Sequence, residues 1–378
     1  SLKQGLLDSG CNICDIGIVP TPLLYFATNY LESNSGVMLT GSHNPKNHNG
    51  LKTLINGKTL SQDGVQEIYK RIINKDYLSA PENNRGSITQ ADVSDAYIKR
   101  ITSSHPLSKK LKVIIDAGNG AASEIGPRLF SALNCELTSL YCELDGNFPN
   151  HHPDPSKPEN LKDLIQAVKD QKADIGLAFD GDADRLGVIT STGHIIWPDR
   201  QMMLYAKAVL EEEPGAKIVF DVKCSKYLAQ IIKENNGIPI MHQTGHSVLK
   251  KKMIEEKAEL AGEMSGHIFF KHKWYGFDDA LYTATRLLEI LSNTDISSEE
   301  LFKQFPEPAS TPEINIAVPE EEKFNIVNTL KNKVKELQIN KDIDFLDSDL
   351  ITIDGLRVEF KTGWGLLRAS NTTACLVT

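Results

Sequence analysis

Three carboxylates alternate along residues 180–185, directly after an apolar run: Asp180, Asp182 and Asp184. Unpaired carboxylates at this spacing would repel one another across a few ångströms, so the pattern favours a shared hard cation. The stretch is not an EF-hand loop, because Arg185 stands where that loop needs glycine and Ser191 where it needs glutamate. Three carboxylates with open coordination positions suit Mg²⁺, and Arg185 is placed to hold a phosphate that bridges to it. A solvated acidic turn is the alternative.

A serine follows a second apolar run, residues 36–39, in a loop that reads Thr-Gly-Ser-His-Asn-Pro. The Ser42 hydroxyl is a poor nucleophile until a base removes its proton or a metal lowers its pKa. His43 and Lys52 lie close enough in sequence to assist, and Lys52 is also able to neutralise a phosphate. The alternative is a turn whose side chains cap a helix.

A third stretch, residues 262–267, reads Gly-Glu-Met-Ser-Gly-His. Glu263 and Ser265 are two residues apart, so in extended chain they face the same side and suit two neighbouring sugar hydroxyls. His267 is suited to exchange protons near neutral pH. A tight turn capped by Ser265 is the alternative.

A fourth stretch, residues 363–373, carries Arg368, whose planar guanidinium can bind a phosphate through two hydrogen bonds. Ser370, Asn371 and Thr372 add donors, so the stretch predicts a phosphate-binding loop without a Walker lysine. The alternative is a hairpin turn. Lys223 follows Asp221 at a predicted strand end, and His246 opens a predicted helix that carries three lysines; either supplies further positive charge, or both belong to ordinary surface.

The elements that position these motifs alternate between β-branched runs and helical patterns, which predicts an α/β fold with parallel or mixed sheets. The runs at 113–116, 177–180 and 218–221 each end in aspartate: Asp116, Asp180 and Asp221. Polar groups therefore lie at the carboxyl ends of strands, where ligands gather in open α/β sheets. Helices are expected over 161–170 and 279–291.

A chain of 378 residues is too long for one core, so two to four domains are expected. Turn-rich stretches near 80–86, 191–193 and 305–312 divide it into four: residues 1–88, 89–193, 194–306 and 307–378. The chain opens without Met and closes on an apolar run that reads as an unfinished strand. We therefore expect the first and last domains to be incomplete.

Composition excludes several classes of function. A formal net charge of −9 argues against non-specific nucleic-acid binding, and no run of 18 apolar residues is present to span a membrane. No signal-peptide pattern opens the sequence. Among six cysteines, only Cys11 and Cys14 form C-x-x-C, without a second pair of metal ligands. A redox motif is one interpretation; thiols in a reducing cytoplasm, where we expect the protein, are the other.

Together and in this order, the four motifs resemble the α-D-phosphohexomutase family, most closely its bacterial phosphomannomutase/phosphoglucomutase branch. The resemblance covers essentially the whole chain. It implies three related mixed α/β domains and a C-terminal α+β phosphate-binding domain around a central cleft. Two residues depart from that branch: Ala374 stands where proline is usual, and Gln243 stands where lysine is frequent. The resemblance also leads us to expect that this sequence lacks a segment that precedes the serine loop in the family.

The resemblance also implies roles for single residues. Ser42 carries the phosphoryl group, and the metal ligands are Ser42, Asp180, Asp182 and Asp184. Sugar hydroxyls bind to Glu263 and Ser265, and the non-reacting phosphate binds to Arg368, Ser370, Asn371 and Thr372. The matching polar positions of the cleft are His43, Lys52, Arg185, Lys223, His246 and His267. Among these, Lys52 and His267 are the candidates for acid–base roles.

The implied enzyme interconverts hexose 1-phosphate and hexose 6-phosphate of mannose or glucose, with Mg²⁺ and with hexose 1,6-bisphosphate as intermediate and activator. We expect a monomer whose partners are small hexose phosphates, and little turnover if this chain is the entire gene product. One alternative is a Mg-dependent phosphatase of the haloacid-dehalogenase type, phosphorylated on Asp180. Another is an inactive sugar-phosphate-binding fragment. The mutase hypothesis requires all four motifs to surround one cavity.

Overall fold

The computed structural model describes residues 1–42, 44, 47–60, 62–340, 345, 347–371 and 373–378. Its contacts divide the chain into two compact units, each described by itself below. The first unit contains residues 1–196 and 265–301, and the second contains residues 197–264 and 302–378. In the described part of the chain, none of the helices combines the length and apolar character that a membrane span needs.

A five-stranded mixed sheet lies at the centre of the first unit, in the order β10-β9-β8-β6-β7. Its strands are β6 (Lys112–Asp116), β7 (Glu136–Leu140), β8 (Ile175–Phe179), β9 (Leu186–Thr190) and β10 (Ile195–Ile196). β6 runs parallel to β7 and β8, whereas β8, β9 and β10 are antiparallel neighbours. Every residue of β8 and β9 is buried. This explains why both strands are continuous apolar runs rather than alternating ones.

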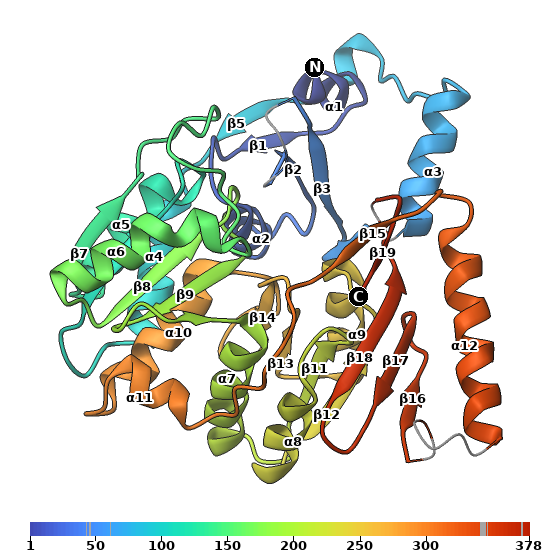
Figure 1. The fold of residues 1–378 in the computed structure, drawn as a ribbon. Coiled ribbons are helices and arrows are strands. Elements are labelled where there is room, and N and C mark those ends of the chain that lie inside the picture. The colour runs from blue at the N-terminus through green and yellow to red at the C-terminus, as the bar shows by residue number, and fades with distance from the viewer. Residues whose placement is uncertain (43, 45–46, 61, 341–344, 346, 372) are drawn as a thin grey trace. The chain divides into compact units, whose positions relative to one another are not determined.

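Helices cover both faces of this sheet (Figure 1). Ile114 packs into the cluster under α6 (Lys162–Gln171), while its neighbour Ile115 approaches Gly126 of α5 (Ala122–Ala132). Successive side chains of a strand point to opposite faces, so adjacent isoleucines serve both layers. The remaining elements of this part are α4 (Ser94–Ser104), β14 (Ile268–Phe270), α10 (Ala280–Ser292) and the start of α11 (Ser298–Lys303).

The first ninety residues add smaller elements to the same unit. They are α1 (Leu2–Asp8), β1 (Ile13–Asp15), α2 (Thr21–Tyr30), β2 (Gly36–Thr40), β3 (Gly50–Ile55), β4 (Lys58–Thr59), α3 (Gln62–Ile73) and β5 (Ile88–Gln90). β1 pairs with β5, and β2, β3 and β4 form an antiparallel sheet. α2 is anchored by Phe26, whose ring lies 5.4 Å from that of Tyr97 and 6.3 Å from that of Trp274. This aromatic packing holds the serine-bearing segment on the rest of the unit.

The second unit contains a parallel group of strands in which β11 (Lys217–Asp221) lies between β12 (Ile238–His242) and β13 (Leu260–Gly262). The helices α7 (Pro198–Glu212) and α9 (His246–Glu256) pack against β13, and α8 (Lys226–Glu234) packs against β12. The carboxyl ends of all three strands therefore meet at one edge, where polar loops follow.

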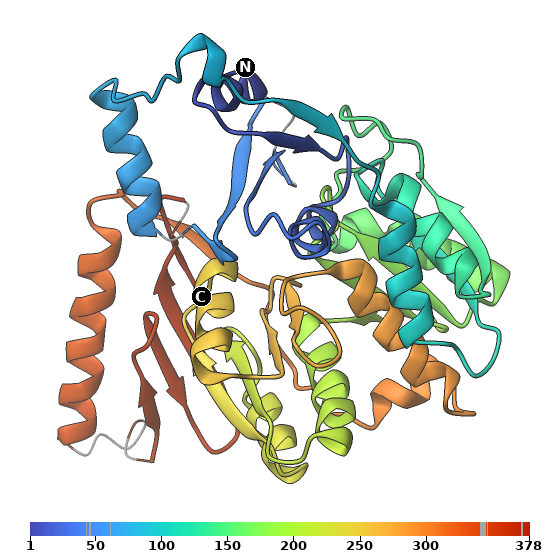
Figure 2. The ribbon, with the colours of Figure 1, turned by 180° about the vertical axis from the view of Figure 1, so that it is seen from behind.

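The rest of the second unit is an antiparallel sheet with the order β15-β19-β18-β17-β16, lined by α12 (Lys323–Ile339) (Figure 2). Its strands are β15 (Asn315–Ala317), β16 (Asp349–Ile351), β17 (Leu356–Glu359), β18 (Trp364–Ala369) and β19 (Cys375–Val377). Val327 of α12 packs against Ala369 and Leu376 of the sheet.

The predicted fold class is confirmed: the chain is α/β with mixed sheets. The apolar runs at 36–39, 113–116, 177–180 and 218–221 are strands, with Asp180 directly after its strand. The expected helices correspond to α6 and α10. The domain boundaries at 88, 193 and 306 stay predictions.

Candidate active site

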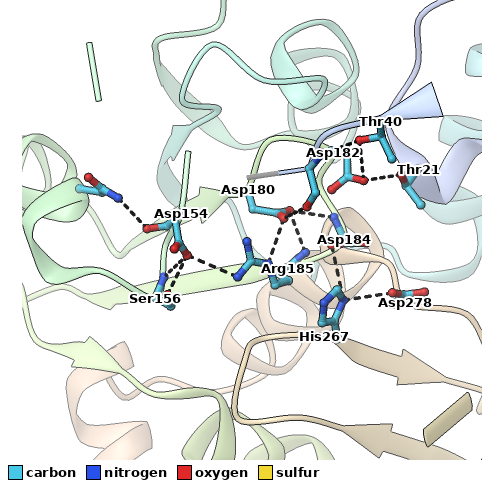
Figure 3. Close-up of polar contacts among 12 residues, drawn as sticks. Thr21, Thr40, Asp154, Ser156, Asp180, Asp182, Asp184, Arg185, His267 and Asp278 are labelled. Atoms are coloured by element: carbon cyan, nitrogen blue, oxygen red, sulfur yellow. Dashed lines mark hydrogen bonds and ion pairs between the residues drawn. The ribbon is translucent and has the colours of Figure 1, made fainter. Parts of the chain in front are cut away.

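The loop between β8 and β9 gathers three carboxylates (Figure 3). Asp180, Asp182 and Asp184 are 0%, 4% and 0% exposed, and each offers an oxygen within 4.8 Å of the others. The turn is tight because the Asp180 carboxylate accepts the backbone N–H groups of Asp184 (3.0 Å) and Arg185 (3.1 Å). One acidic side chain therefore folds the loop that presents the other two.

Ser42 lies at this loop. Its Oγ donates to Asp180 Oδ2 over 3.1 Å, and its backbone N–H donates to Thr40 Oγ1 over 2.8 Å. Ser42 has φ +50°, an uncommon value for a residue with a side chain. A Cβ on Gly181 would stand 2.2 Å from the Ser42 carbonyl oxygen, so only glycine allows this approach. The serine predicted as nucleophile and the predicted metal loop are thus in direct contact.

Asp182 collects donors from the serine-bearing segment. Its Oδ2 accepts hydrogen bonds from Thr21 Oγ1 (2.7 Å), Thr40 Oγ1 (3.0 Å) and Lys52 Nζ (2.8 Å). Lys52 comes from β3, opposite Met38 of β2, and also pairs with Asp184. The short β2–β3 hairpin therefore brings the ammonium group of Lys52 onto two carboxylates.

Arg185 and His267 border the cluster from the other side (Figure 3). Arg185 is buried; its Nε lies 3.0 Å from Asp180 Oδ2, and its Nη1 lies 3.4 Å from Asp154 Oδ1. An isolated antiparallel bridge joins the backbones of Arg185 and His267. His267 Nδ1 lies 3.0 Å from Asp278 Oδ2 and 3.4 Å from Asp184 Oδ1.

Burial and crowding shift the pKa values in the cluster. Burial, with the nearby Asp184 charge, raises the pKa of Asp180 to about 6. Burial and Asp182 also raise the pKa of Asp184. Burial acts in the same direction on Asp182, but Lys52 and the hydrogen bonds to its carboxylate outweigh it and lower the pKa to about 2. Burial lowers the pKa of Lys52, but Asp184 and Asp182 raise it well above its ordinary value.

This cluster fits a hard divalent cation. Asp182 Oδ1 and Asp184 Oδ1 are buried and receive no hydrogen bond within the described part of the chain. With Asp180 and Asp278 nearby, the carboxylates outnumber the permanent cations Lys52 and Arg185. Such an excess of buried negative charge is costly unless a further cation neutralises it. The acidic triad could therefore hold a metal ion through oxygen ligands alone.

The sugar-binding candidates of the second unit lie at the strand ends of its parallel sheet. Buried Glu263 follows β13, and its Oε1 accepts the backbone N–H of Gly245 over 2.5 Å. Lys223 follows β11 and donates to Glu313 Oε2 over 2.7 Å. Burial lowers the pKa of Lys223, but Asp221 and Glu313 outweigh it, so the pKa is raised. His246 is the first residue of α9.

The phosphate-binding candidates follow or end β18. Buried Arg368 directs Nε to Asp354 Oδ2 over 3.0 Å. Ser370 Oγ accepts the backbone N–H and the hydroxyl of Thr373, at 3.2 and 2.8 Å, and Asn371 is exposed. Two predicted residues, His43 and Thr372, lie outside the described residues.

The predicted site residues thus assemble in two groups. Seven meet in the first unit: Ser42, Lys52, Asp180, Asp182, Asp184, Arg185 and His267. In the second unit, Thr244 and Asp354 link the neighbourhood of Glu263 to Arg368. Ser265 follows β13 by three residues in the chain, and its role stays a prediction. That both groups face one cavity also stays a prediction.

Sequence reasoning missed several polar partners in both groups: Thr21, Thr40, Asp154, Thr244, Asp278 and Asp354. Two of them had a weak signal in the sequence. Asp278 belongs to an acidic pair before a helix, and Asp354 belongs to an Asp-Gly turn between strands. Each pattern is common in turns and caps, so neither points to a site by itself.

Comparison with known proteins adds an independent line of evidence. Four models of the phosphoglucomutase/phosphomannomutase family match the chain: α/β/α domain I over residues 1–79, domain II over 95–193, domain III over 197–309 and the C-terminal domain over 313–378. The phosphomannomutase/phosphoglucomutase of Pseudomonas putida is 54% identical over 376 residues, which cover 100% of this chain and 78% of that protein. The phosphoglucomutase of Neisseria gonorrhoeae is 51% identical, with 100% and 80% covered.

A solved structure agrees. The phosphoglucomutase/phosphomannomutase family protein of Burkholderia thailandensis matches with a TM-score of 0.90 and 45% identity, over 100% of this chain and 80% of that chain. These relatives favour the mutase over the haloacid-dehalogenase phosphatase and the inactive binding fragment. The predicted resemblance is confirmed. This chain belongs to the phosphoglucomutase/phosphomannomutase family.

Proposed function

We propose that the chain is a phosphohexomutase that interconverts the 1-phosphates and 6-phosphates of glucose and mannose, with Ser42 as the phosphoryl carrier. One observation carries this proposal: Ser42 Oγ lies 3.1 Å from Asp180 Oδ2, at the edge of three buried carboxylates. A bare carboxylate cluster would repel a phosphorylated serine. A cation held by these carboxylates would supply the positive charge that stabilises phosphoserine there.

Mg²⁺ is the cation we propose, held by Asp180, Asp182, Asp184 and an oxygen of phosphorylated Ser42. It would supply the positive charge that phosphoryl transfer needs. Its ligands here are oxygens alone, as Mg²⁺ prefers. Arg185 lies beside the same cluster, with Nη2 lacking a hydrogen-bond partner among the described residues. That nitrogen is our candidate contact to the transferred phosphate.

The reaction has two balanced transfers. The bond between Ser42 Oγ and phosphorus breaks as phosphorus bonds to the free C6 or C1 hydroxyl, whose proton passes to a base. The resulting hexose 1,6-bisphosphate, the intermediate and activator, turns end for end. Its other phosphate then returns to Ser42, and the new sugar hydroxyl regains a proton. Lys52 and His267 both border the acidic cluster. His267 is our candidate base, and Lys52, which its raised pKa keeps protonated, is our candidate proton donor.

Substrate recognition is assigned to the remaining residues. Glu263 and Ser265 would bind two sugar hydroxyls, and Arg368, Ser370, Asn371 and Thr372 would bind the non-reacting phosphate. Lys223, His246 and His43 would add polar contacts to the bisphosphate. A grip on hydroxyls 3 and 4 does not reach carbon 2, where glucose and mannose differ, so both sugars should serve. We also propose that the enzyme acts as a cytoplasmic monomer.

A coupled assay with glucose 1-phosphate, Mg²⁺ and catalytic hexose 1,6-bisphosphate tests the carrier. Ser42→Ala should lower turnover by ~10³-fold or more, because the nucleophile is lost. Ser33→Ala, in an exposed loop segment, should leave turnover unchanged. Mass spectrometry should find phosphate on Ser42; an acyl phosphate on Asp180 would support the phosphatase. Tight binding without exchange of label between positions 1 and 6 would support a binding protein.

The same assay with mannose 1-phosphate tests the substrate class. Comparable turnover of both sugars supports a grip that does not read carbon 2. A strong preference for an N-acetylated or aminated hexose would contradict it.

A further inference from the structure

Arg368 is held in one direction by a single carboxylate. Its Nε lies 3.0 Å from Asp354 Oδ2, and its Nη2 is buried without a hydrogen-bond partner in the described ranges. The side chains of Arg368 and Asp354 are 6% and 15% exposed. Arginine has several rotatable bonds, so this part-buried ion pair is what fixes where the remaining guanidinium nitrogens point. The direction of Arg368 therefore depends on Asp354.

The turn that carries Asp354 is built against Arg368. Asp354 and Gly355 connect β16 to β17, and β17 pairs with β18, with Leu356 opposite Leu367. Gly355 has φ +83°, and a Cβ there would stand 2.3 Å from the Leu367 carbonyl oxygen and 2.6 Å from Arg368 Cβ. Only glycine lets the turn approach so closely. The hairpin thus delivers the Asp354 carboxylate to Arg368 by backbone geometry.

The same carboxylate also holds the loop after β12. Asp354 Oδ2 accepts the backbone N–H of Thr244 over 3.1 Å, beside a hydrogen bond from Gln243 Nε2 to the Ile353 carbonyl over 3.1 Å. The next backbone N–H, that of Gly245, donates to Glu263 Oε1. Two carboxylates therefore bind consecutive amides of one loop. One of them directs the arginine proposed for phosphate, and the other is the glutamate proposed for sugar hydroxyls.

Asp221 fixes this loop from its other side. The fully buried carboxylate accepts the Thr244 hydroxyl over 2.9 Å through Oδ2. Its Oδ1 accepts the backbone N–H of Met264, the residue after Glu263, over 3.2 Å. The loop is held on both sides by part-buried hydrogen bonds, so a shift at Asp354 is transmitted to Glu263 rather than absorbed.

From this chain of contacts we propose that Asp354 is a positioning residue that orients Arg368 and couples it, through the backbone of Thr244 and Gly245, to Glu263. The phosphate and the sugar hydroxyls of one hexose phosphate are then bound cooperatively. The inference rests on the proposed function of these residues in hexose phosphate binding. Asp354 itself does not touch the substrate; it acts through Arg368.

Calorimetric titration with glucose 6-phosphate tests the positioning role. Asp354→Ala should weaken binding by ~10-fold, with KM raised more than kcat is lowered, because a part-buried charged hydrogen bond is lost. Asp354→Asn keeps one acceptor oxygen without the charge and should lie between wild type and Asp354→Ala. Asp347→Asn is the matched control, since Asp347 pairs with exposed Lys361 in the same domain, and it should bind as wild type does. Unchanged binding by a folded Asp354→Asn variant and by Asp354→Ala would overturn the proposal.

A double-mutant cycle with Glu263→Gln tests the coupling. If the two residues act together, the double variant Asp354→Ala/Glu263→Gln should bind ~5-fold or more tighter than the product of the single losses predicts. Losses that multiply independently would overturn the coupling. Binding and turnover also separate this inference from the proposed function. A wild-type chain that binds glucose 6-phosphate without mutase activity would refute the proposed reaction, while the cycle would still decide whether Asp354 and Glu263 are coupled.

Discussion

The strands β8 and β11 each lead to a buried aspartate, but the two aspartates have different surroundings. Asp180 follows β8 and Asp221 ends β11, and both are fully buried. The hydrogen bonds to Asp221 come from neutral groups: the Thr244 hydroxyl, the Met264 backbone N–H and the Cys224 thiol, at 2.9, 3.2 and 3.1 Å. Asp180 instead shares a six-residue loop with two more carboxylates and an arginine.

This difference separates a carboxylate that fixes the fold from the proposed reaction centre. Neutral donors satisfy one carboxylate and fix the loops around it, which is what Asp221 does for Thr244 and Met264. At Asp180, burial and then the neighbouring charges of Asp184 and Asp182 oppose ionisation, and the pKa rises to about 6. Added positive charge, such as that of a bound cation, would favour the ionised form of this cluster. Both aspartates lie at the carboxyl end of a strand, so the proposed chemistry depends on the residues of the loop that follows β8.

The largest effect on turnover is expected when the charge of Asp180, in the acidic loop after β8, is removed. Asp180→Asn should lower mutase turnover by ~10³-fold, because the amide supplies neither the charge nor the ligand strength for a divalent cation. The fold should persist, since buried negative charge is reduced. Turnover in the coupled assay and Mg²⁺ affinity by calorimetry are the measurements. Asp170→Asn, on the exposed surface of α6, is the control; turnover of Asp180→Asn within tenfold of wild type would remove the acidic loop from the reaction.

The second effect comes from pushing Ser42 away while keeping every charge. Gly181→Ala places a methyl group 2.2 Å from the Ser42 carbonyl oxygen, so the serine loop must move. Misplacement of a nucleophile by about 1 Å costs on the order of 10²-fold in rate, and we expect that loss in turnover. Gly146→Ala is the control, because among the described residues beyond its two chain neighbours no atom lies within 4 Å of its added Cβ. Equal turnover of the two variants would show that contact between Ser42 and the acidic loop is not needed.

Much of this architecture was predictable from the sequence, because the signals are local. Strands covered on both faces need continuous apolar runs, so β6, β8 and β11 were recognisable before any pairing was known. The acidic triad was equally visible, since its three carboxylates lie within five residues. The order of the four motifs then predicted the family.

The partners of these residues were not predictable, because they come from distant parts of the chain. Arg185 was expected to hold phosphate, yet its Nε and Nη1 are directed to Asp180 and to Asp154, 31 residues away. Asp354 accepts a hydrogen bond from Thr244, which lies 110 residues away in the chain. An aspartate before a glycine is also common in turns, so the sequence alone does not mark Asp354 as a site residue. The polar groups that fix a site are therefore hidden until the fold brings them together.

Substitutions of Asp221 should lower the free energy of unfolding more than they lower turnover. Asp221→Ala leaves the Met264 N–H, the Thr244 hydroxyl and the Cys224 thiol without their shared acceptor, which should cost ~2 kcal/mol of unfolding free energy. Asp221→Asn keeps one acceptor and should cost about half as much, with turnover within tenfold of wild type. Urea unfolding and the coupled assay measure the two quantities. A 10³-fold loss of turnover in a folded Asp221→Asn variant would show that Asp221 takes part in the reaction, as proposed for Asp180, and would contradict the proposed difference between the two aspartates.

The smallest effect is expected at a third aspartate that ends a strand, Asp116, which can be compared with Asp180 and Asp221. Asp116 ends β6, and its carboxylate lies 3.0 Å from His151 Nε2. Burial lowers the pKa of His151, but the hydrogen bond to Asp116 and its charge outweigh it, so the folded pKa stands above the ordinary 6.5. Protonation is thus favoured by folding, and the stabilisation is full below pH 6.5 and is lost as the pH rises through the folded pKa.

Urea unfolding between pH 6 and pH 9 should therefore show a decline of ~0.5 kcal/mol that His151→Gln removes, because glutamine does not titrate. Neither the loss of stability with pH nor the His151→Gln substitution should change turnover, because His151 neutralises Asp116 without an added cation. Asp116 would then be an intermediate case, charged like Asp180 but satisfied by one partner like Asp221. If stability instead rose with pH in wild type and not in His151→Gln, the imidazole would be held neutral. The ion pair would then not be what satisfies the buried Asp116.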